Sequence, residues 1–238
     1  QMAGLLKVTR KIPTLIAVPT TAGTGSETTL AAVIVDSETR HKYVINDFAL
    51  IPPYAVLDPA VIRSLPASVA AETGIDALTH AVEAYVSTFA TEYTDGFCKE
   101  ATKMVFDYLP RAYRSAFKGA KADPVAREKM ADASALAGIG FANAFLGINH
   151  SLSHKIGGGF HIPHGTANAL LFPYVCRFNA QKHPYHMGTF SQYRYPQAFE
   201  RYVQLGELIG VKGATDEETF ENWIRAAEQL KKDVDIPE

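Results

Sequence analysis

The distribution of strand and helix signals along the chain is the feature that most constrains its fold. Short apolar runs rich in β-branched residues occur only before residue 66, at residues 14–18, 31–35, 43–45 and 54–57. Such runs, separated by turn residues, are typical of strands. After Pro66 the apolar positions recur at helical spacing. The sequence therefore predicts a strand-rich α/β part over residues 1–65 and an all-helical part over residues 66–238.

Cap and breaker residues divide the helical part. Asp123 followed by Pro124 is typical of a helix start, whereas Pro110 and the glycines at 157–159 predict helix stops. We expect helices over residues 68–84, 95–108, 123–145, 166–176, 197–209 and 215–234, and another that carries His150 and His154. Three small residues in the 123–145 segment predict close approach of a neighbouring helix: Ala135, Gly138 and Gly140.

Composition excludes several classes of protein. Hydrophobic residues make up 47% and charged residues 20%, which is ordinary for a globular protein. A formal net charge of −2 without a basic tract argues against nucleic-acid and anionic-membrane partners. The longest apolar stretch, residues 135–148, is shorter than the roughly 20 residues of a membrane span. Two cysteines in unlike surroundings predict no disulfide framework and a reducing, cytoplasmic location.

Asp76 and His80 are four residues apart in a helical segment, so both side chains project from one face. A carboxylate and an imidazole in this arrangement can share one divalent cation. The alternative is a simple hydrogen bond between them, since such pairs are common without a metal. Glu83 lies one turn beyond His80, where it can orient a metal ligand or form a structural ion pair.

A second cluster strengthens the metal hypothesis. Four of the eight histidines fall within residues 150–164, namely His150, His154, His161 and His164. The segment is otherwise apolar and glycine-rich, and histidines in an apolar setting need a partner such as a metal. Spacing alone does not say which two of the four join Asp76 and His80. Such ligands suit Fe(II), Zn(II), Mn(II) or Ni(II), and leave room for an exogenous oxygen, as a Lewis-acid catalyst requires.

The segment Thr-Thr-Ala-Gly-Thr-Gly-Ser-Glu at residues 20–27 follows the first long apolar run. Its glycines permit tight turns, and its hydroxyl groups can contact a phosphate or a ribose. It is neither a Walker loop, because no Lys follows the glycines, nor a GxGxxG motif, because Thr28 stands at the third glycine. An ordinary polar turn is the alternative. Lys42 is a cation near the following hairpin that can reach the same ligand or remain solvated.

Three motifs, in their order and spacing, resemble those of the iron-containing alcohol dehydrogenases. They are the 20–27 loop, the segment Gly-Ile-Asp-Ala-Leu-Thr-His-Ala-Val-Glu-Ala-Tyr at residues 74–85, and His150 separated by thirteen residues from His164-Gly165. Four connecting segments resemble more closely the alcohol dehydrogenase half of bifunctional aldehyde–alcohol dehydrogenases: residues 84–87, 141–147, 160–165 and 190–193. The resemblance extends over nearly the whole chain.

The resemblance implies a dehydroquinate synthase-like, iron alcohol dehydrogenase fold. Residues 1–65 would be the C-terminal part of an α/β dinucleotide-binding domain, and residues 66–238 an all-helical metal-binding domain that is C-terminally truncated. The implied ligands of Fe²⁺, or of Zn²⁺ as a substitute, are Asp76, His80, His150 and His164. His154 would be a catalytic group near the nicotinamide. The implied contacts to NAD(H) are Thr20, Thr21, Thr24, Thr29, Val33 and Lys42.

The sequence departs from the family in its extent, since upstream βα units with a glycine-rich pyrophosphate loop are missing. With Gln1 entering a strand-like pattern almost at once, we expect a piece of a longer protein. The resemblance implies NAD(H)-linked interconversion of an aldehyde and a primary alcohol, acetaldehyde and ethanol above all, in a homo-oligomer or a helical filament. Alternatives are a family member acting on diols, longer alcohols or keto acids, a filament-forming segment without turnover, and a metal-binding domain without redox chemistry.

Overall fold

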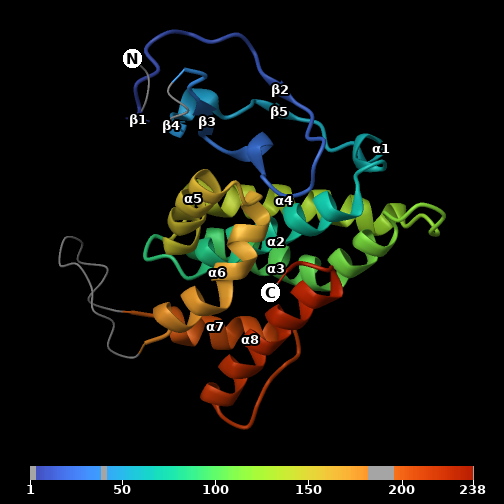
Figure 1. The fold of residues 1–238 in the computed structure, drawn as a ribbon. Helices are drawn as coiled ribbons and strands as arrows, with labels where there is room; N and C mark the ends of the chain where they lie inside the picture. Colours follow the sequence, from blue (N-terminus) through green and yellow to red (C-terminus); the bar gives the residue numbers. More distant parts are fainter. Residues whose placement is uncertain (1–3, 39–41, 182–195, 238) are drawn as a thin grey trace.

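A computed structural model describes residues 4–38, 42–181 and 196–237, except for the side chain of Lys42. Its strands form a layer above a body of helices (Figure 1). Residues 190–193, one of the segments that carry the family resemblance, lie outside the described part. Every described strand lies at or before residue 55, and the long helices begin at residue 67.

The strand layer contains two small sheets. β1 (Gly4–Leu5), β4 (Lys42–Asn46) and β3 (Ala31–Val35) form one sheet in the order β1-β4-β3, with β1 parallel and β3 antiparallel to β4. β2 (Ile16–Ala17) and β5 (Tyr54–Ala55) pair in parallel to form the other. The sequence prediction is confirmed for β3 and β4, whereas β2 and β5 are shorter than expected. The turn η1 (Ser26–Thr28) connects β2 to β3, and η2 (Phe48–Leu50) follows β4.

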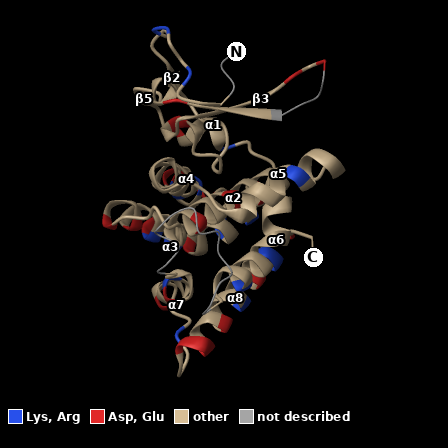
Figure 2. Ribbon diagram, turned by 90° about the vertical axis from the view of Figure 1, so that its left-hand side faces the viewer, with Lys and Arg blue, Asp and Glu red and all other residues tan. Residues whose placement is uncertain are grey.

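The helical body follows the strands. After the short α1 (Pro59–Ile62), it consists of α2 (Ala67–Tyr85), α3 (Glu92–Arg114), α4 (Pro124–Ala144), α5 (Ile148–Phe160), α6 (His164–Asn179), α7 (Ala198–Leu208) and α8 (Asp216–Asp233). Side-chain caps fix several starts. Thr91 forms a capping box with Thr94, and the Asp123 carboxylate accepts the N–H of Ala126. In α8, acidic residues occupy the first turn and basic residues the last, which complements the helix dipole (Figure 2).

Helix α2 is the centre of the body. Every residue from Gly74 to Tyr85 is buried, and the helix packs against α3, α4 and α6. A helix that is buried on all sides belongs to a core. It can approach α3 closely because Gly74 faces Leu109, where a β-carbon would lie 2.2 Å from a Leu109 methyl carbon. The fold therefore carries Asp76 and His80 into the interior rather than leaving them on a helix surface.

Two predicted helix stops are wrong. Pro110 lies inside α3, which continues to Arg114, because the last turns bury Leu109, Ala112 and Tyr113 in the core. That burial outweighs the hydrogen bond that proline removes. The glycines at 157–159 lie within α5, which ends only where His161 adopts a left-handed conformation (φ 56°). Tertiary packing thus overrides local propensity at Pro110.

Small residues of α4 permit two close contacts, of which one is the predicted helix approach. A β-carbon at Gly140 would lie 2.5 Å from the Cys98 sulfur of α3. Gly138 instead faces η1 and its N-cap Gly25 at the end of the 20–27 loop, where a β-carbon would lie 2.2 Å from Thr28 Oγ1. The loop is held there by hydrogen bonds from Gly25 N–H to Ser134 and from Thr28 to the Ala135 carbonyl. Within the described residues no single helix is long and apolar enough to cross a membrane; α4 and α5 pass that test only as a pair bent by 108°.

Candidate metal centre

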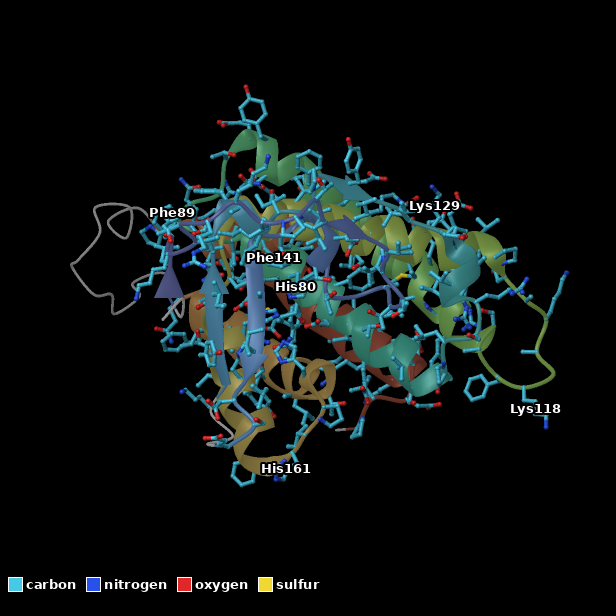
Figure 3. The ribbon with its side chains drawn as sticks, turned by 90° about the horizontal axis from the view of Figure 1, so that it is seen from above. His80, Phe89, Lys118, Lys129, Phe141 and His161 are labelled. Carbon is cyan, nitrogen blue, oxygen red and sulfur yellow. The ribbon has the colours of Figure 1, made fainter. Side chains whose placement is uncertain are left out.

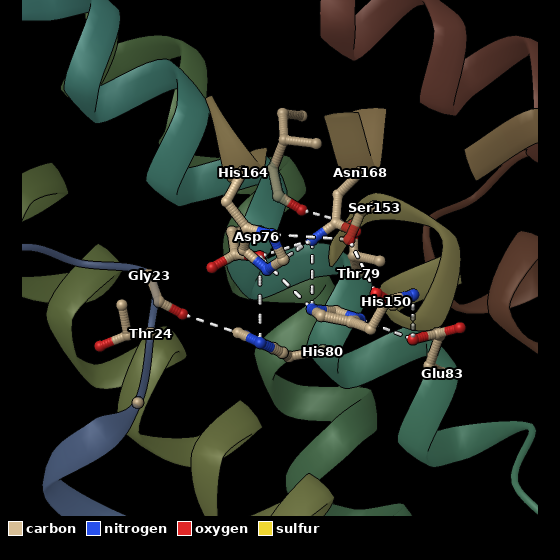
Figure 4. Close-up of polar contacts among 12 residues, drawn as sticks. Gly23, Thr24, Asp76, Thr79, His80, Glu83, His150, Ser153, His164 and Asn168 are labelled. Atoms are coloured by element: carbon tan, nitrogen blue, oxygen red, sulfur yellow. Dashed lines mark hydrogen bonds and ion pairs between the residues drawn. The ribbon is translucent and has the colours of Figure 1, made fainter. Parts of the chain in front are cut away.

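Asp76, His80, His150 and His164 converge at one point beneath the strand layer (Figure 4). Asp76 Oδ1 lies 3.9 Å from His80 Nε2, 3.4 Å from His150 Nε2 and 3.6 Å from His164 Nε2. Helix α2 supplies the first two residues, α5 supplies His150 and the first residue of α6 is His164. Ligand atoms of Asp76, His80 and His150 all lie within 4.8 Å of one another, a spacing that one metal ion can bridge.

The other ring nitrogen of each histidine has a polar contact that fixes which nitrogen faces the cluster. His80 Nδ1 donates to the Gly23 carbonyl (3.1 Å), since a carbonyl can only accept. His150 Nδ1 lies 2.6 Å from Glu83 Oε2, and His164 Nδ1 lies 3.5 Å from Ser153 Oγ, whose hydroxyl donates to the His150 carbonyl. Each Nε2 therefore faces Asp76, and such support of ligand orientation is typical of metal sites.

Glu83 connects α2 to the start of α5. Its carboxylate accepts the backbone N–H groups of Asn149 (2.7 Å) and His150 (3.3 Å) as well as the His150 ring. These N–H groups lack helical partners, because the first amides of any helix do. The helix dipole also stabilises a negative charge near the N-terminus of α5. One buried carboxylate thus positions both the helix and the imidazole that it carries.

Two buried asparagines connect α5, α6 and α2. Asn168 donates its amide to Asp76 Oδ1 (2.7 Å), with His150 Nε2 3.1 Å and His164 Nε2 3.4 Å from the same nitrogen. Asn149 donates to both the side-chain and the backbone oxygen of Asn168. Neither asparagine is more than 1% exposed. The Asp76 carboxylate is therefore oriented by a network that reaches three helices.

The protonation states of the cluster suit a cation. Burial would raise the pKa of Asp76, but the neighbouring histidines outweigh it and hold that pKa below its ordinary value. Burial lowers the pKa of His80 to about 4, so this ring is neutral at neutral pH. Burial opposes protonation of His150 too, yet hydrogen bonds to Asp76 and Glu83 raise its pKa to about 9. Because one carboxylate and three imidazoles converge, the donor set fits a divalent transition metal. Such a metal would replace the proton that His150 otherwise holds between its ring and Asp76.

A cavity of about 960 Å³ opens from the cluster between the strand layer and the helices. Asp76, His80, His150 and His164 line one part of it, and β3 and β4 line another. Phe141 of α4 stacks on His80 with ring centroids 4.4 Å apart, and His150 stacks on the other face of His80 at 4.5 Å. Seen from the strand side, Phe141 and His80 lie side by side beneath the strands (Figure 3). The cavity is large enough for a cofactor together with a small substrate.

Only some of the residues implied as cofactor contacts line the described cavity. Thr24, Thr29 and Val33 line the cavity. Thr20 is exposed and Thr21 is half-buried, and neither is part of the described cavity wall. The backbone of Lys42 pairs with Val35, whereas its side chain is outside the described part of the chain.

The fold places His154 and His161, the other two clustered histidines, at different distances from the centre. His154 lines the cavity, and its ring meets that of His164 edge-on at 5.0 Å. His161 is exposed at the end of α5 and lies apart from the centre (Figure 3). The structure therefore brings together three of the four clustered histidines.

Several polar groups around the centre had no clear signal in the sequence. The sequence marks Gly23 only as a turn residue, but its carbonyl accepts a hydrogen bond from His80, and a β-carbon at Gly23 would lie 2.5 Å from Thr73. Asn168 follows His164 by four residues, a spacing that places both on one helix face. Only the packing of α6 against α2 shows that Asn168 reaches Asp76.

The fold and the site together define a class: a protein in which a helical domain supplies a buried carboxylate–histidine metal centre and an α/β part covers its cavity. Comparison with known proteins gives the family. Residues 70–238 match the Fe-containing alcohol dehydrogenase family, C-terminal, and residues 2–59 match the iron-containing alcohol dehydrogenase family. The chain belongs to the iron-containing alcohol dehydrogenase family.

Relatives differ in their length and in the alcohol for which they are named. Aldehyde-alcohol dehydrogenase 2 of Entamoeba histolytica is 46% identical over 92% of this chain, and the matched region is 24% of that protein. The 1-propanol dehydrogenase PduQ of Citrobacter freundii is 44% identical over 95% of this chain and 57% of its own length. The chain thus spans about a quarter of the first relative and little more than half of the second.

Solved structures confirm the fold. A 1,3-propanediol oxidoreductase superposes with a TM-score of 0.86 at 37% identity, covering 99% of this chain and 57% of the other. The sulfoacetaldehyde reductase of Bifidobacterium kashiwanohense, solved with NAD⁺, superposes with a TM-score of 0.78 at 28% identity, over 97% of this chain and 55% of the other. The predicted α/β part followed by a helical domain is therefore confirmed.

Proposed function

We propose that this chain is the metal-binding portion of an Fe²⁺-dependent, NAD(H)-linked alcohol dehydrogenase that interconverts an aldehyde and a primary alcohol. The observation that carries the proposal is the convergence of three histidine Nε2 atoms on Asp76 Oδ1 at the wall of a large cavity. Asp76, His80, His150 and His164 are the proposed ligands, and Zn²⁺ is the proposed substitute metal. When bound, the metal supplies Lewis-acid polarisation of a carbonyl group and the nicotinamide supplies the hydride.

The side chains around the centre have separate proposed tasks. The Asp76 carboxylate offsets part of the cation's charge, and Gly23 and Glu83 fix the orientation of His80 and His150. The Phe141 ring, stacked on His80, excludes water from one side. His154 lies beside His164 at the cavity wall, where we assign it the role of holding and passing the proton that accompanies hydride transfer.

The nicotinamide cofactor is proposed to lie across the strand layer. Thr24, Thr29 and Val33 line the same cavity as the metal ligands, which supports their assignment as contacts. Thr20, Thr21 and Lys42 stay proposals from the family resemblance. We treat residues 1–65 as part of a dinucleotide-binding domain and residues 66–238 as part of the metal-binding domain. A homo-oligomer or filament is proposed on the resemblance alone.

The proposed substrate couple, acetaldehyde and ethanol, rests on the family resemblance, and the relative from Entamoeba histolytica, an aldehyde-alcohol dehydrogenase, supports an aldehyde and an alcohol in general. The relative named for 1-propanol supports a slightly longer substrate equally well. The test is oxidation of NADH or NADPH by the iron-loaded, naturally occurring protein, with acetaldehyde, propanal, a diol-derived aldehyde and a keto acid offered in turn. We expect the highest kcat/KM with acetaldehyde and NADH. Bound iron without turnover of any substrate would overturn the enzyme proposal in favour of a structural or metal-storage role.

His164→Ala tests the ligand set. His164 Nε2 is one of the three imidazole nitrogens near Asp76 Oδ1, so its loss should lower metal content and activity together. The side chain is 34% exposed, more than those of Asp76 and His150, so the variant should remain folded. Metal analysis after dialysis measures the metal content, and circular dichroism measures folding. His161→Ala, at the exposed end of α5, is the control. Full metal content in His164→Ala would show that the proposed ligand set is wrong.

A further inference from the structure

The α4–α5 connection contains a strained residue at the cavity wall. Phe145, directly after α4, has φ 64° and ψ 179°, a backbone conformation that is nearly confined to glycine because a β-carbon is crowded there. Its ring is half exposed, with 51% of its surface accessible. Both features oppose stability, since an aromatic ring gains free energy by burial. A strained residue that persists at such a place points to a function.

Neighbouring contacts hold the strained turn in place. Before it, Ser87 donates a hydrogen bond to the Ala144 carbonyl and accepts the N–H of Phe89. Phe145 N–H donates to the Phe141 carbonyl (2.8 Å), which closes the last turn of α4. After it, a β-carbon at Gly147 would lie 2.8 Å from Glu83 Oε1. The connection is therefore fixed on both sides of Phe145. The backbone conformation of Phe145 is set by these contacts rather than by the intrinsic preference of phenylalanine.

The residues that line the cavity indicate where Phe145 lies relative to the metal centre. Phe141 stacks directly on His80, and Phe145 follows four residues later, directly after the end of α4. Both residues line the cavity that the candidate ligands also line. The Phe145 ring meets the Phe89 ring edge-on, with centroids 5.6 Å apart. Phe89 lies closer to the edge of the molecule than Phe141 does (Figure 3). Phe145 thus stands between the metal centre and the outside.

We propose that Phe145 is a specificity-determining residue that limits the length of the aldehyde or alcohol chain. This inference rests on the proposed function. In this proposal the alkyl chain of a substrate whose carbonyl oxygen points to the cluster lies along Phe141, which lines the same cavity. Acetaldehyde ends before Phe145, whereas hexanal extends past Phe141 and meets the Phe145 ring. The strained backbone keeps the ring in that path, because an ordinary helical or extended conformation would direct the side chain elsewhere.

The test uses the naturally occurring protein with its metal and nicotinamide, and compares kcat/KM for acetaldehyde, butanal and hexanal. Phe145→Gly removes the ring and relieves the backbone strain, so this variant should fold at least as stably as Phe145→Ala in urea unfolding. In both variants the ratio of hexanal to acetaldehyde kcat/KM should rise about tenfold or more, because removing the ring makes room for several methylene groups. Phe145→Leu keeps most of the apolar volume and should stay near the wild-type ratio.

Phe117→Ala is the matched control. Phe117 is 49% exposed and also meets another ring, that of Tyr113, edge-on, but it is not part of the described cavity wall. Its neighbour Lys118 lies at the opposite end of the molecule from Phe89 (Figure 3). An unchanged chain-length ratio in both Phe145→Gly and Phe145→Ala, with acetaldehyde still turned over, would overturn this inference. A wild-type protein that turns over none of the three aldehydes would instead overturn the proposed function.

Discussion

At the residue scale, the centre depends on groups that hold its ligands as much as on the ligands themselves. Gly23, Glu83 and Ser153 each contact the Nδ1 atom of one histidine, and Asn168 contacts Asp76. A ligand that is already oriented loses little conformational entropy when a metal binds. The contribution of these residues to metal affinity is therefore separable from their contribution to folding.

Glu83→Gln tests this separation. Glutamine keeps one carbonyl oxygen, so it can accept the N–H of Asn149 or that of His150 but not both, and it removes the charge that pairs with the His150 ring. We expect metal affinity to fall about 10- to 100-fold while the protein stays folded. Competition with a chromogenic chelator measures the affinity.

Glu72→Gln is the control for this measurement, because Glu72 lies on the same helix and interacts with Thr166 rather than with a histidine. Its metal affinity should stay near that of the wild type. Equal affinity of Glu83→Gln and the wild type would show that Glu83 serves the fold alone.

Glu27 gives a pH-dependent prediction. The residue is 3% exposed, and within the described structure its Oε2 atom has no hydrogen-bond partner. Burial raises the pKa of Glu27 above 4.5, with a backbone amide opposing only part of the shift. A carboxyl group whose pKa is raised in the folded state is most favourable to folding while protonated. Its contribution is lost as the pH rises from the unfolded pKa through the folded one.

Glu27→Gln does not titrate, so its unfolding free energy relative to the wild type should increase between about pH 4 and about pH 7. Urea unfolding at the two pH values measures this difference. Glu128→Gln changes an exposed residue and should show no comparable trend. If the Glu27→Gln difference is the same at both pH values, the carboxyl group does not titrate with a raised pKa.

At the element scale, the contact between the 20–27 loop and α4 positions the strand layer against the helices. Gly25 N–H and Thr28 bind polar groups of α4, and Gly138 leaves the space for them. The same loop supplies the Gly23 carbonyl to His80 and the Thr24 side chain to the cavity. Moving the loop away from α4 would therefore disturb the metal ligand and the cofactor side together.

Gly138→Ala tests this contact. The added β-carbon would lie 2.2 Å from Thr28 Oγ1 and 2.7 Å from the Gly25 carbonyl oxygen. Overpacking of this kind should lower the free energy of unfolding by about 1–3 kcal/mol, measured by urea denaturation.

Gly96→Ala provides the comparison for Gly138→Ala. Gly96 lies in α3 with nothing within 4 Å of an added β-carbon, so helix propensity alone should raise stability by about 0.5–1 kcal/mol. Changes of the same sign in both variants would contradict the close packing of the loop on α4.

At the scale of the whole molecule, the proposed ligands come from α2, α5 and α6 and meet only in the folded protein. Metal binding should therefore stabilise the fold, by about 2.7 kcal/mol when free metal is at one hundred times its dissociation constant. Urea unfolding with buffered metal, and again with excess chelator, measures this increment. Asp76→Asn should remove most of the increment, because Asp76 Oδ1 is the atom on which the three imidazoles converge. An unfolding free energy independent of metal would contradict a site assembled by folding.

The sequence by itself determined the order of the two parts, the pairing of Asp76 with His80 and the concentration of histidines after residue 149. Helical spacing and apolar periodicity are local properties, so they can be recognised without a structure. Pro110 gave a wrong helix end, because burial of the flanking residues outweighed its local preference, and the 157–159 glycines lie within α5, which ends directly after them at Phe160.

Only the tertiary structure decided which histidines share a point in space. It directed His150 and His164 towards Asp76, placed His154 at the cavity wall and left His161 exposed. It also connected Glu83 to His150, Asn168 to Asp76 and Gly23 to His80, across 67, 92 and 57 residues of chain. Contacts of this separation depend on how α2 packs against α5, α6 and the loop, and no periodicity within one segment encodes that packing.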